Sequence, residues 1–233
     1  MLHRLASSGE SCLAANDWIC LEYLRTRKQE LIDATVQHLW ITAVSVVLGV
    51  LIAFPLALLA RRYKAARAPV FGITTLLYTI PSLAMFSLLL PVFGISPSVV
   101  VTGLVLYSLT LLVRNILAGL DAVPDEVRES ARGMGYGTAR MLFRVELPLA
   151  LPASMAGLRI ATVSTIALTT VGSLINYGGL GNLINDGVQT RFKAQVLTAS
   201  VICVLLAFAA DALLLLVQRW LTPWKRVRTA KGA

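Results

Sequence analysis

The charged side chains of this sequence gather in residues 121–152, DAVPDEVRESARGMGYGTARMLFRVELPLALP, between two long apolar segments. The stretch holds four arginines and five carboxylates, namely Arg128, Arg132, Arg140 and Arg144 with Asp121, Asp125, Glu126, Glu129 and Glu146. The sequence has no HExxH motif, no nucleophile elbow and no GxxxxGK[ST] phosphate loop. Ion pairing is therefore the chemistry these groups offer, and any ATP must be hydrolysed by another chain.

The elements that position these charges are predicted to be a helix, a glycine turn and a second helix. Pro124 suits a first helical position, and the carboxylates behind it favour the positive end of the helix dipole. Arg132 falls in the last turn, after which three glycines end the helix. Thr138 can cap a second short helix that runs to about Glu146 and that Pro148 stops.

The spacing within this loop resembles the EAA motif of ABC-importer permeases. The glutamate, the second alanine, the glycine and the Leu-Pro pair match in register, whereas a serine replaces one alanine and a valine replaces an isoleucine. The resemblance implies a coupling helix that docks in a groove of a cytoplasmic ATPase subunit. The residues concerned are Glu129, Ser130, Ala131, Arg132, Gly135, Val145, Leu147 and Pro148. The alternative is a solvated loop with ordinary helix caps.

Other tracts narrow the resemblance. YTIPSLAMFSLLLPVFGI, LYSLTLLVRNILAGL and NYGGLGNLI resemble permeases of the glycine betaine/carnitine/choline importers, over roughly residues 30–220. That family implies a second permease subunit, identical or paralogous, two cytoplasmic ATPase subunits and an extracytoplasmic substrate-binding protein, with no cofactor and no nucleic acid. Three rival interpretations remain. The first is a permease for methionine, another amino acid or a thiol-betaine. The others are a membrane scaffold that only binds a partner and a membrane-embedded enzyme.

The composition is that of an all-α polytopic membrane protein. The chain is 57% hydrophobic and 14% charged with a mean hydropathy of +0.74, whereas soluble domains carry about 25% charged residues. Apolar runs predict five membrane spans, at 39–60, 69–90, 98–120, 153–175 and 194–217. The resemblance implies that these spans form a five-helix type I importer core over residues 39–220. An interfacial or extracytoplasmic segment, 1–38, precedes it, and a basic cytoplasmic tail, 221–233, follows.

The basic residues predict the orientation in a bacterial inner membrane. The segments expected inside, 61–67, 121–152 and 218–233, hold 13 lysines and arginines, against six in the outside segments. The N-terminus is therefore expected outside and the C-terminus in the cytoplasm. The net charge of +9 is explained by topology and contact with anionic lipid.

Two sets of residues are candidates for the transport path. Pro81 interrupts the second span beside Tyr78 and Ser82, and with Tyr107 of the next span these residues suit a substrate path, although a packing kink explains them equally well. Gly178, Gly179 and Gly181 follow the fourth span and allow a sharp turn ahead of a short helix at 182–188. The resemblance implies an outer gate there; the alternative is a plain turn.

Three charges lie inside predicted spans, each six residues from the inner end: Arg114, Arg159 and Asp211. An unpaired charge in a span is costly, so we expect Asp211 to pair with Arg159, which an antiparallel neighbour brings close. Arg114 is the alternative partner, or it lines the inner mouth of the pore. For the arginines the alternative is snorkelling to the interface.

Two features near the outer side complete the expectations. Cys12 and Cys20 form no metal spacing and can form a disulfide if that end is exported. His38 lies at the mouth of the first span, where we expect a hydrated interfacial side chain rather than a ligand.

Overall fold

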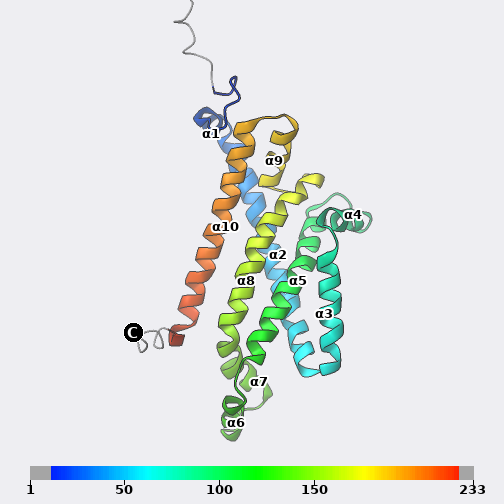
Figure 1. Cartoon of the computed structure of the whole chain (residues 1–233), viewed down its shortest axis with the longest axis vertical. Helices are drawn as coiled ribbons and strands as arrows, with labels where there is room; N and C mark the ends of the chain where they lie inside the picture. Colours follow the sequence, from blue (N-terminus) through cyan, green and yellow to red (C-terminus); the bar gives the residue numbers. More distant parts are fainter. Residues whose placement is uncertain (1–11, 226–233) are drawn as a thin grey trace, which may run out of the picture.

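The computed structural model describes residues 12–225, and every regular element in that part of the chain is a helix. The first eleven residues and the basic tail beyond Lys225, with their predicted roles, lie outside the described residues. Figure 1 shows the helices α1 (Leu21–Thr26), α2 (Lys28–Arg62), α3 (Lys64–Thr79), α4 (Ser82–Phe93), α5 (Pro97–Asp121), α6 (Asp125–Gly133), α7 (Thr138–Met141), α8 (Leu147–Thr169), α9 (Leu180–Gln189) and α10 (Lys193–Leu221). A π-helical turn (Leu142–Glu146) joins α7 to α8, and a 3-10 turn (Thr170–Ile175) follows α8.

Within residues 12–225, four helical segments are long and apolar enough to cross a membrane: α2, α5, the continuous run 138–175, and α10. The α3–α4 pair passes the same test together, but it is bent by 100° at its break. The long segments run side by side along the long axis of the molecule (Figure 1). The prediction of an all-α polytopic membrane protein is confirmed.

The second span differs from the straight segment predicted at 69–90. Its helix begins at Lys64, and it ends at Thr79, because the proline that follows Ile80 has no N–H and excludes the helical conformation from the residue before it. Ile80 is accordingly extended, with ψ 127°. The α4 helix then starts in a new direction and turns away from the bundle axis (Figure 1).

Two predicted helix boundaries also differ. Pro148 was expected to stop a short helix, but α7, the π-helical turn and α8 continue into the fourth span. Pro148 is the second residue of α8 and directly follows the π-helical turn that ends at Glu146, so its missing N–H falls where the regular α-helical hydrogen-bond pattern is already interrupted. At the N-terminal side, α2 runs unbroken from Lys28 past the predicted boundary at 38/39.

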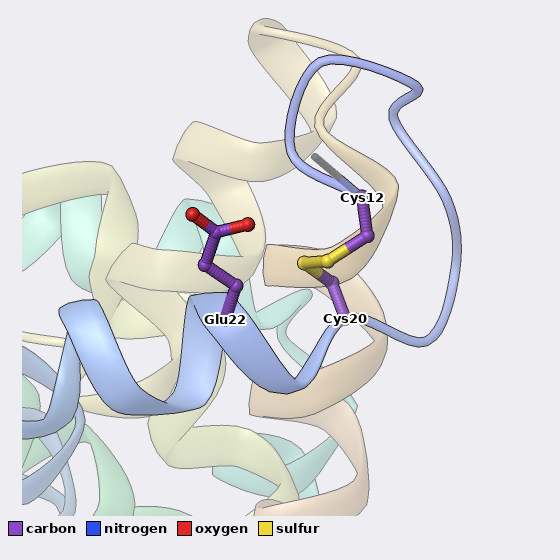
Figure 2. A group of neighbouring side chains, drawn as sticks. All are labelled: Cys12, Cys20 and Glu22. Carbon is purple, nitrogen blue, oxygen red and sulfur yellow. A yellow bond between two sulfur atoms is a disulfide. The ribbon is translucent and has the colours of Figure 1, made fainter. Parts of the chain in front are cut away.

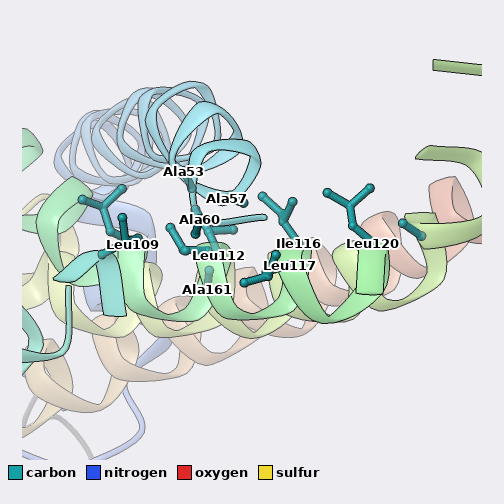
Figure 3. Close-up of a cluster of buried hydrophobic side chains, with 12 residues drawn as sticks. Ala53, Ala57, Ala60, Leu109, Leu112, Ile116, Leu117, Leu120 and Ala161 are labelled. Atoms are coloured by element: carbon teal, nitrogen blue, oxygen red, sulfur yellow. The ribbon is translucent and has the colours of Figure 1, made fainter. Parts of the chain in front are cut away.

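The core lies around α5, which packs against α2, α3, α4 and α8. Small side chains on α2 let the two backbones approach closely, and larger side chains from α5 fill the space between the helices. Figure 3 shows this contact, formed by Ala53, Ala57 and Ala60 of α2 with Leu109, Leu112, Ile116, Leu117 and Leu120 of α5 and Ala161 of α8. In contrast, no residue in the most apolar window of α10 is buried, as expected for a helix that faces lipid.

The bundle has two distinct ends. The junction of α2 with α3, the α6–α7 loop and the end of α10 lie at one end, and α1 and α9 lie at the other (Figure 1). The described parts of the three segments that the sequence predicts to be cytoplasmic therefore share one end of the molecule.

Candidate functional site

The helix α6 projects from the bundle and carries the charged residues of the motif (Figure 1). Pro124 is extended (ψ 143°) and precedes the first turn, which holds two carboxylates, while Arg132 lies in the last turn. Glu129 and Arg132 are both exposed, and Ala131 is the buried residue of this helix. Among the described ion pairs none joins Glu129 to Arg132.

A glycine in the left-handed region makes the turn after α6. Gly135 has φ +79°, which a residue with a side chain rarely adopts. Its N–H donates to the Arg132 carbonyl at 2.9 Å, and the N–H of Tyr136 donates to the Ala131 carbonyl at 3.1 Å. These two bonds close the end of the helix, so the predicted need for glycine at this position is confirmed.

A buried carboxylate lies at the base of this loop. Arg61, the last residue but one of α2, donates through Nη1 and Nη2 to the two oxygens of Glu146, at 2.7 and 2.6 Å. Arg128 of α6 donates through Nε to the same carboxylate at 3.1 Å. The sequence predicts Arg128 and Glu146 only as loop charges and Arg61 only as part of a basic cytoplasmic segment, and it does not predict their contact. A carboxylate directly before the Leu-Pro pair, in an otherwise apolar stretch, was the available signal.

The residues proposed for the transport path meet at the break between α3 and α4. The Tyr107 hydroxyl donates a hydrogen bond to the Ile80 carbonyl, and its ring packs edge-on against Tyr78, with centroids 6.0 Å apart. Ser82 is half-buried in the first turn of α4 beside the exposed Pro81. The tyrosine of α5 thus holds the bend in place by bonding a backbone oxygen at the break.

The third charged residue of the spans, Arg114, takes no part in the predicted carboxylate pairing. Its Nη2 donates to the Thr75 hydroxyl at 3.0 Å, and its guanidinium lies 5.5 Å from the centre of the Phe71 ring. Both partners belong to α3. The side chain is exposed on the face of α5 that meets α3, which leaves Arg159 as the partner of Asp211.

The ion pair expected between α8 and α10 is present. Arg159 donates through Nε and Nη2 to the two oxygens of Asp211, each at 2.7 Å. Both helices extend beyond the predicted inner ends of their spans, because α8 begins at Leu147 and α10 continues to Leu221. Asp211 is ten residues from that end, about 15 Å along the axis at the α-helical rise.

The outer glycine tract is packed against α2. Gly179 has φ +56°, and a Cβ placed on it would lie 2.6–2.7 Å from the Cβ, Cα and N of His38. The Gly179 N–H donates to Gln37 Oε1 at 3.1 Å. A Cβ on Gly181 would lie 2.2 Å from the Thr170 carbonyl oxygen. The tract is therefore a close-packed junction of α2, the 3-10 turn and α9, with α9 beginning two residues earlier than predicted.

His38 is a buried residue of this junction, not the hydrated side chain that the sequence predicted. It is 0% exposed, with Nδ1 3.2 Å from the Gly178 oxygen and Nε2 3.0 Å from the Ile166 oxygen. A neutral imidazole has one N–H and donates to one of these carbonyls. The prediction failed because the tract that covers His38 is 140 residues distant in sequence.

A disulfide closes the segment before α1 at the outer end. Figure 2 shows Cys12 joined to Cys20, with Glu22 on the adjacent turn of α1. Both sulfurs are used in the bond, so this group offers no thiolates to a metal. Within the loop, the side chain of Asn16 bonds the Arg191 carbonyl at 2.9 Å and the Lys193 N–H at 3.0 Å. These two hydrogen bonds hold the loop against the turn between α9 and α10.

Tyr23 anchors α1 to the same turn. Its ring packs edge-on against Phe192, with centroids 5.3 Å apart, and it is 1% exposed. Burial, followed by the nearby Glu30, raises the pKa of its phenol to about 12. The phenol therefore remains neutral over the physiological range.

Comparison with known proteins decides the family. Residues 45–227 match the family described as the binding-protein-dependent transport system inner membrane component. The chain belongs to this family. It is a multi-pass inner-membrane permease of an ABC importer, a non-catalytic subunit, and the fold predicted from the EAA resemblance is confirmed.

Individual relatives align over most of the permease. The osmoprotectant import permease protein OsmW of Salmonella typhimurium is 38% identical over 208 residues, which cover 87% of this chain and 97% of that protein. The choline transport system permease protein OpuBB of Bacillus subtilis is 34% identical over 203 residues, covering 87% and 94%. The solved inward-facing MetNI methionine ABC transporter has a chain of the same fold, with TM-score 0.74 and 21% identity over 84% of this chain and 98% of that chain.

Proposed function

We propose that this permease forms half of a translocation pore for a quaternary-ammonium osmoprotectant such as glycine betaine, choline or carnitine. The observation that carries the proposal is the alignment over most of the chain with permeases named for osmoprotectant and choline transport. The similarity to the MetNI structure supports the fold and does not favour methionine as the substrate.

ATP hydrolysis belongs to partner subunits in this proposal. The exposed face of α6, with Glu129 and Arg132, is the docking surface for a cytoplasmic ATPase subunit. Support comes from the projection of this helix at the end where the basic segments gather, which the positive-inside rule assigns to the cytoplasm. Two permease subunits with two ATPase subunits complete the transporter, and a binding protein delivers the solute at the α9 end.

The transport path in this proposal follows the break between α3 and α4. Tyr78 and Ser82 offer an aromatic face and a hydroxyl beside backbone that is no longer within a helix. Irregular backbone at membrane depth is tolerated where protein or a water-filled cavity surrounds it. The junction at Gly178, Gly179 and Gly181 is the proposed outer gate, since it joins the described outer elements to α2.

The test is solute uptake into proteoliposomes that contain the permease, its ATPase subunits and the substrate-loaded binding protein. We expect ATP-dependent uptake of labelled choline or glycine betaine, and none with an ATPase subunit that has lost its Walker lysine. Uptake of labelled methionine in place of both would overturn the substrate class. ATPase activity without uptake of any solute would support a membrane scaffold instead.

A further inference from the structure

We infer that Glu146 and Arg128 are positioning residues that pass the movement of α6 to the transmembrane bundle, an inference that rests on the coupling role of α6 proposed above. The contacts of two side chains carry it. Arg61 of α2 donates hydrogen bonds to both oxygens of Glu146 at 2.7 and 2.6 Å, and Arg128 of α6 donates to the same carboxylate at 3.1 Å. One carboxylate thus connects the first span, the coupling helix and the base of the fourth span.

Arg128 also connects this group of residues to the third span, α5. Its Nη2 donates to the Leu120 carbonyl at 2.8 Å, in the last turn of α5, and its Nη1 donates to Asp125 at 2.7 Å. The planar guanidinium therefore bonds three acceptors with three different nitrogens. A lysine ammonium is a single point charge on a flexible stem and does not reproduce this fork.

Apolar packing alone does not account for the position of α6. Ala131 is the buried residue of that helix, and α6 packs mainly against α7 and the π-helical turn. The ionic contacts are by comparison well shielded, since the side chains of Glu146, Arg61 and Arg128 are 9%, 19% and 18% exposed. Charge-assisted hydrogen bonds in shielded surroundings are strong and directional, so they hold α6 at a defined angle to the spans.

The position of Glu146 in the chain connects this contact directly to α8. It ends the π-helical turn, and the next residue, Leu147, begins α8. Single π-helical turns are common at functional sites, where they redirect side chains from a helix. A displacement of α6 therefore acts on the carboxylate through Arg128 and reaches α2 through Arg61 and α8 through the backbone.

The same end of the molecule offers a matched control. Arg67 of α3 pairs with Asp121 at 2.8 Å, but its side chain is 50% exposed and that of Asp121 37%. This pair joins α3 to the end of α5, and in the described part of the chain neither side chain bonds a residue of α6. Exposed pairs of this kind contribute little to stability.

The experiment compares Arg128→Lys and Glu146→Gln with Arg67→Lys in the complete transporter in proteoliposomes. We expect both network variants to insert and to retain their ATPase subunits, while the ATP hydrolysed per solute transported rises by about tenfold or more. Arg67→Lys should keep the ratio of the unmodified transporter. A spin label on an exposed residue of the α6 end, Met134, should become more mobile in Arg128→Lys and remain unchanged in Arg67→Lys.

Three outcomes would overturn the inference. An unchanged ATP-to-solute ratio in Arg128→Lys and Glu146→Gln would remove the network from coupling. Loss of membrane insertion in both network variants would show that the network is needed for folding rather than for coupling. An equal rise in Arg67→Lys would show that replacing any paired arginine at this end uncouples the transporter. If the unmodified complex shows no ATP-driven uptake, the proposed function itself fails, which is a different result.

Discussion

Arg159 of α8 and Asp211 of α10 form a two-pronged ion pair, with Nε and Nη2 of the arginine each 2.7 Å from a different carboxylate oxygen. The pair lies within two membrane spans, so its partly exposed surface faces lipid or a neighbouring subunit rather than bulk water. In those surroundings either charge alone is costly, and two parallel hydrogen bonds fix the relative rotation of the helices. The contact joins α10, which has few buried residues, to the rest of the bundle.

Removing one member of this pair should destabilise the permease. Asp211→Asn and Arg159→Gln are each expected to lower the melting temperature in detergent by several degrees, because each leaves the other charge without its partner. The double variant should lose less than the sum of the two. Arg67→Gln with Asp121→Asn is the control cycle, and near-additivity is expected there. Strict additivity for Arg159 and Asp211 would contradict the pairing.

Gly135→Ala should impair coupling without preventing insertion. The residue has φ +79° and open space around the position of a Cβ, so the cost is that of the left-handed conformation, about 1–2 kcal/mol. The native turn should then be about 5–30-fold less favoured, with a fall in ATP-driven uptake. Gly133→Ala is the control, because that glycine also has open space but no positive φ. Equal uptake in the two variants would remove the turn from the coupling mechanism.

Glu129→Lys should weaken the docking of the ATPase subunit. The side chain is exposed on α6 and forms no ion pair within residues 12–225, so reversing its charge should disturb the partner rather than the permease fold. The matched control is Glu126→Lys, an exposed charge reversal in the first turn of the same helix. Co-purification of the ATPase subunit measures the effect. Equal retention by both variants would show that Glu129 has no specific role.

Gly179→Ala should destabilise the outer junction. A methyl group would lie 2.6–2.7 Å from backbone and Cβ atoms of His38, which a helix cannot move cheaply, and the residue has φ +56°. The expected loss is about 2–4 kcal/mol of unfolding free energy, from overpacking together with the left-handed conformation. Gly72→Ala on α3 is the control, since nothing lies within 4 Å of its Cβ position. An unchanged free energy of unfolding in Gly179→Ala would show that the junction opens readily.

Loss of the disulfide should release the N-terminal loop from the turn between α9 and α10. Cys12→Ser with Cys20→Ser should speed amide exchange at residues 190–193 by about 30–150-fold, since closing a short loop contributes roughly 2–3 kcal/mol. The free Cys203 supplies the control, because Cys203→Ser should leave that exchange unchanged. Exchange that is equally slow in both variants would show that the remaining contacts hold the loop without the bond.

The class of the protein and the local structure of its charged loop could be predicted from the amino-acid sequence. Apolar length and the scarcity of charges decide which segments enter a bilayer, and the cap and glycine signals around α6 act within a few residues of one another. The need for glycine at residue 135 could therefore be predicted from the residues close to it in the chain. Even the Arg159–Asp211 contact could be predicted, because an isolated aspartate in a span needs a partner and few residues qualify.

The contacts between most residues that lie far apart in the chain could not be predicted in this way and became visible in the folded structure. His38 is buried because the Gly178 tract folds back over it, and Glu146 meets Arg61 across 85 residues of sequence. The bend at Pro81 has a local cause, but its stabilisation by the Tyr107 hydroxyl depends on how α5 packs against α3. Such contacts depend on the relative position and rotation of packed helices, which the spacing of residues along one helix does not specify.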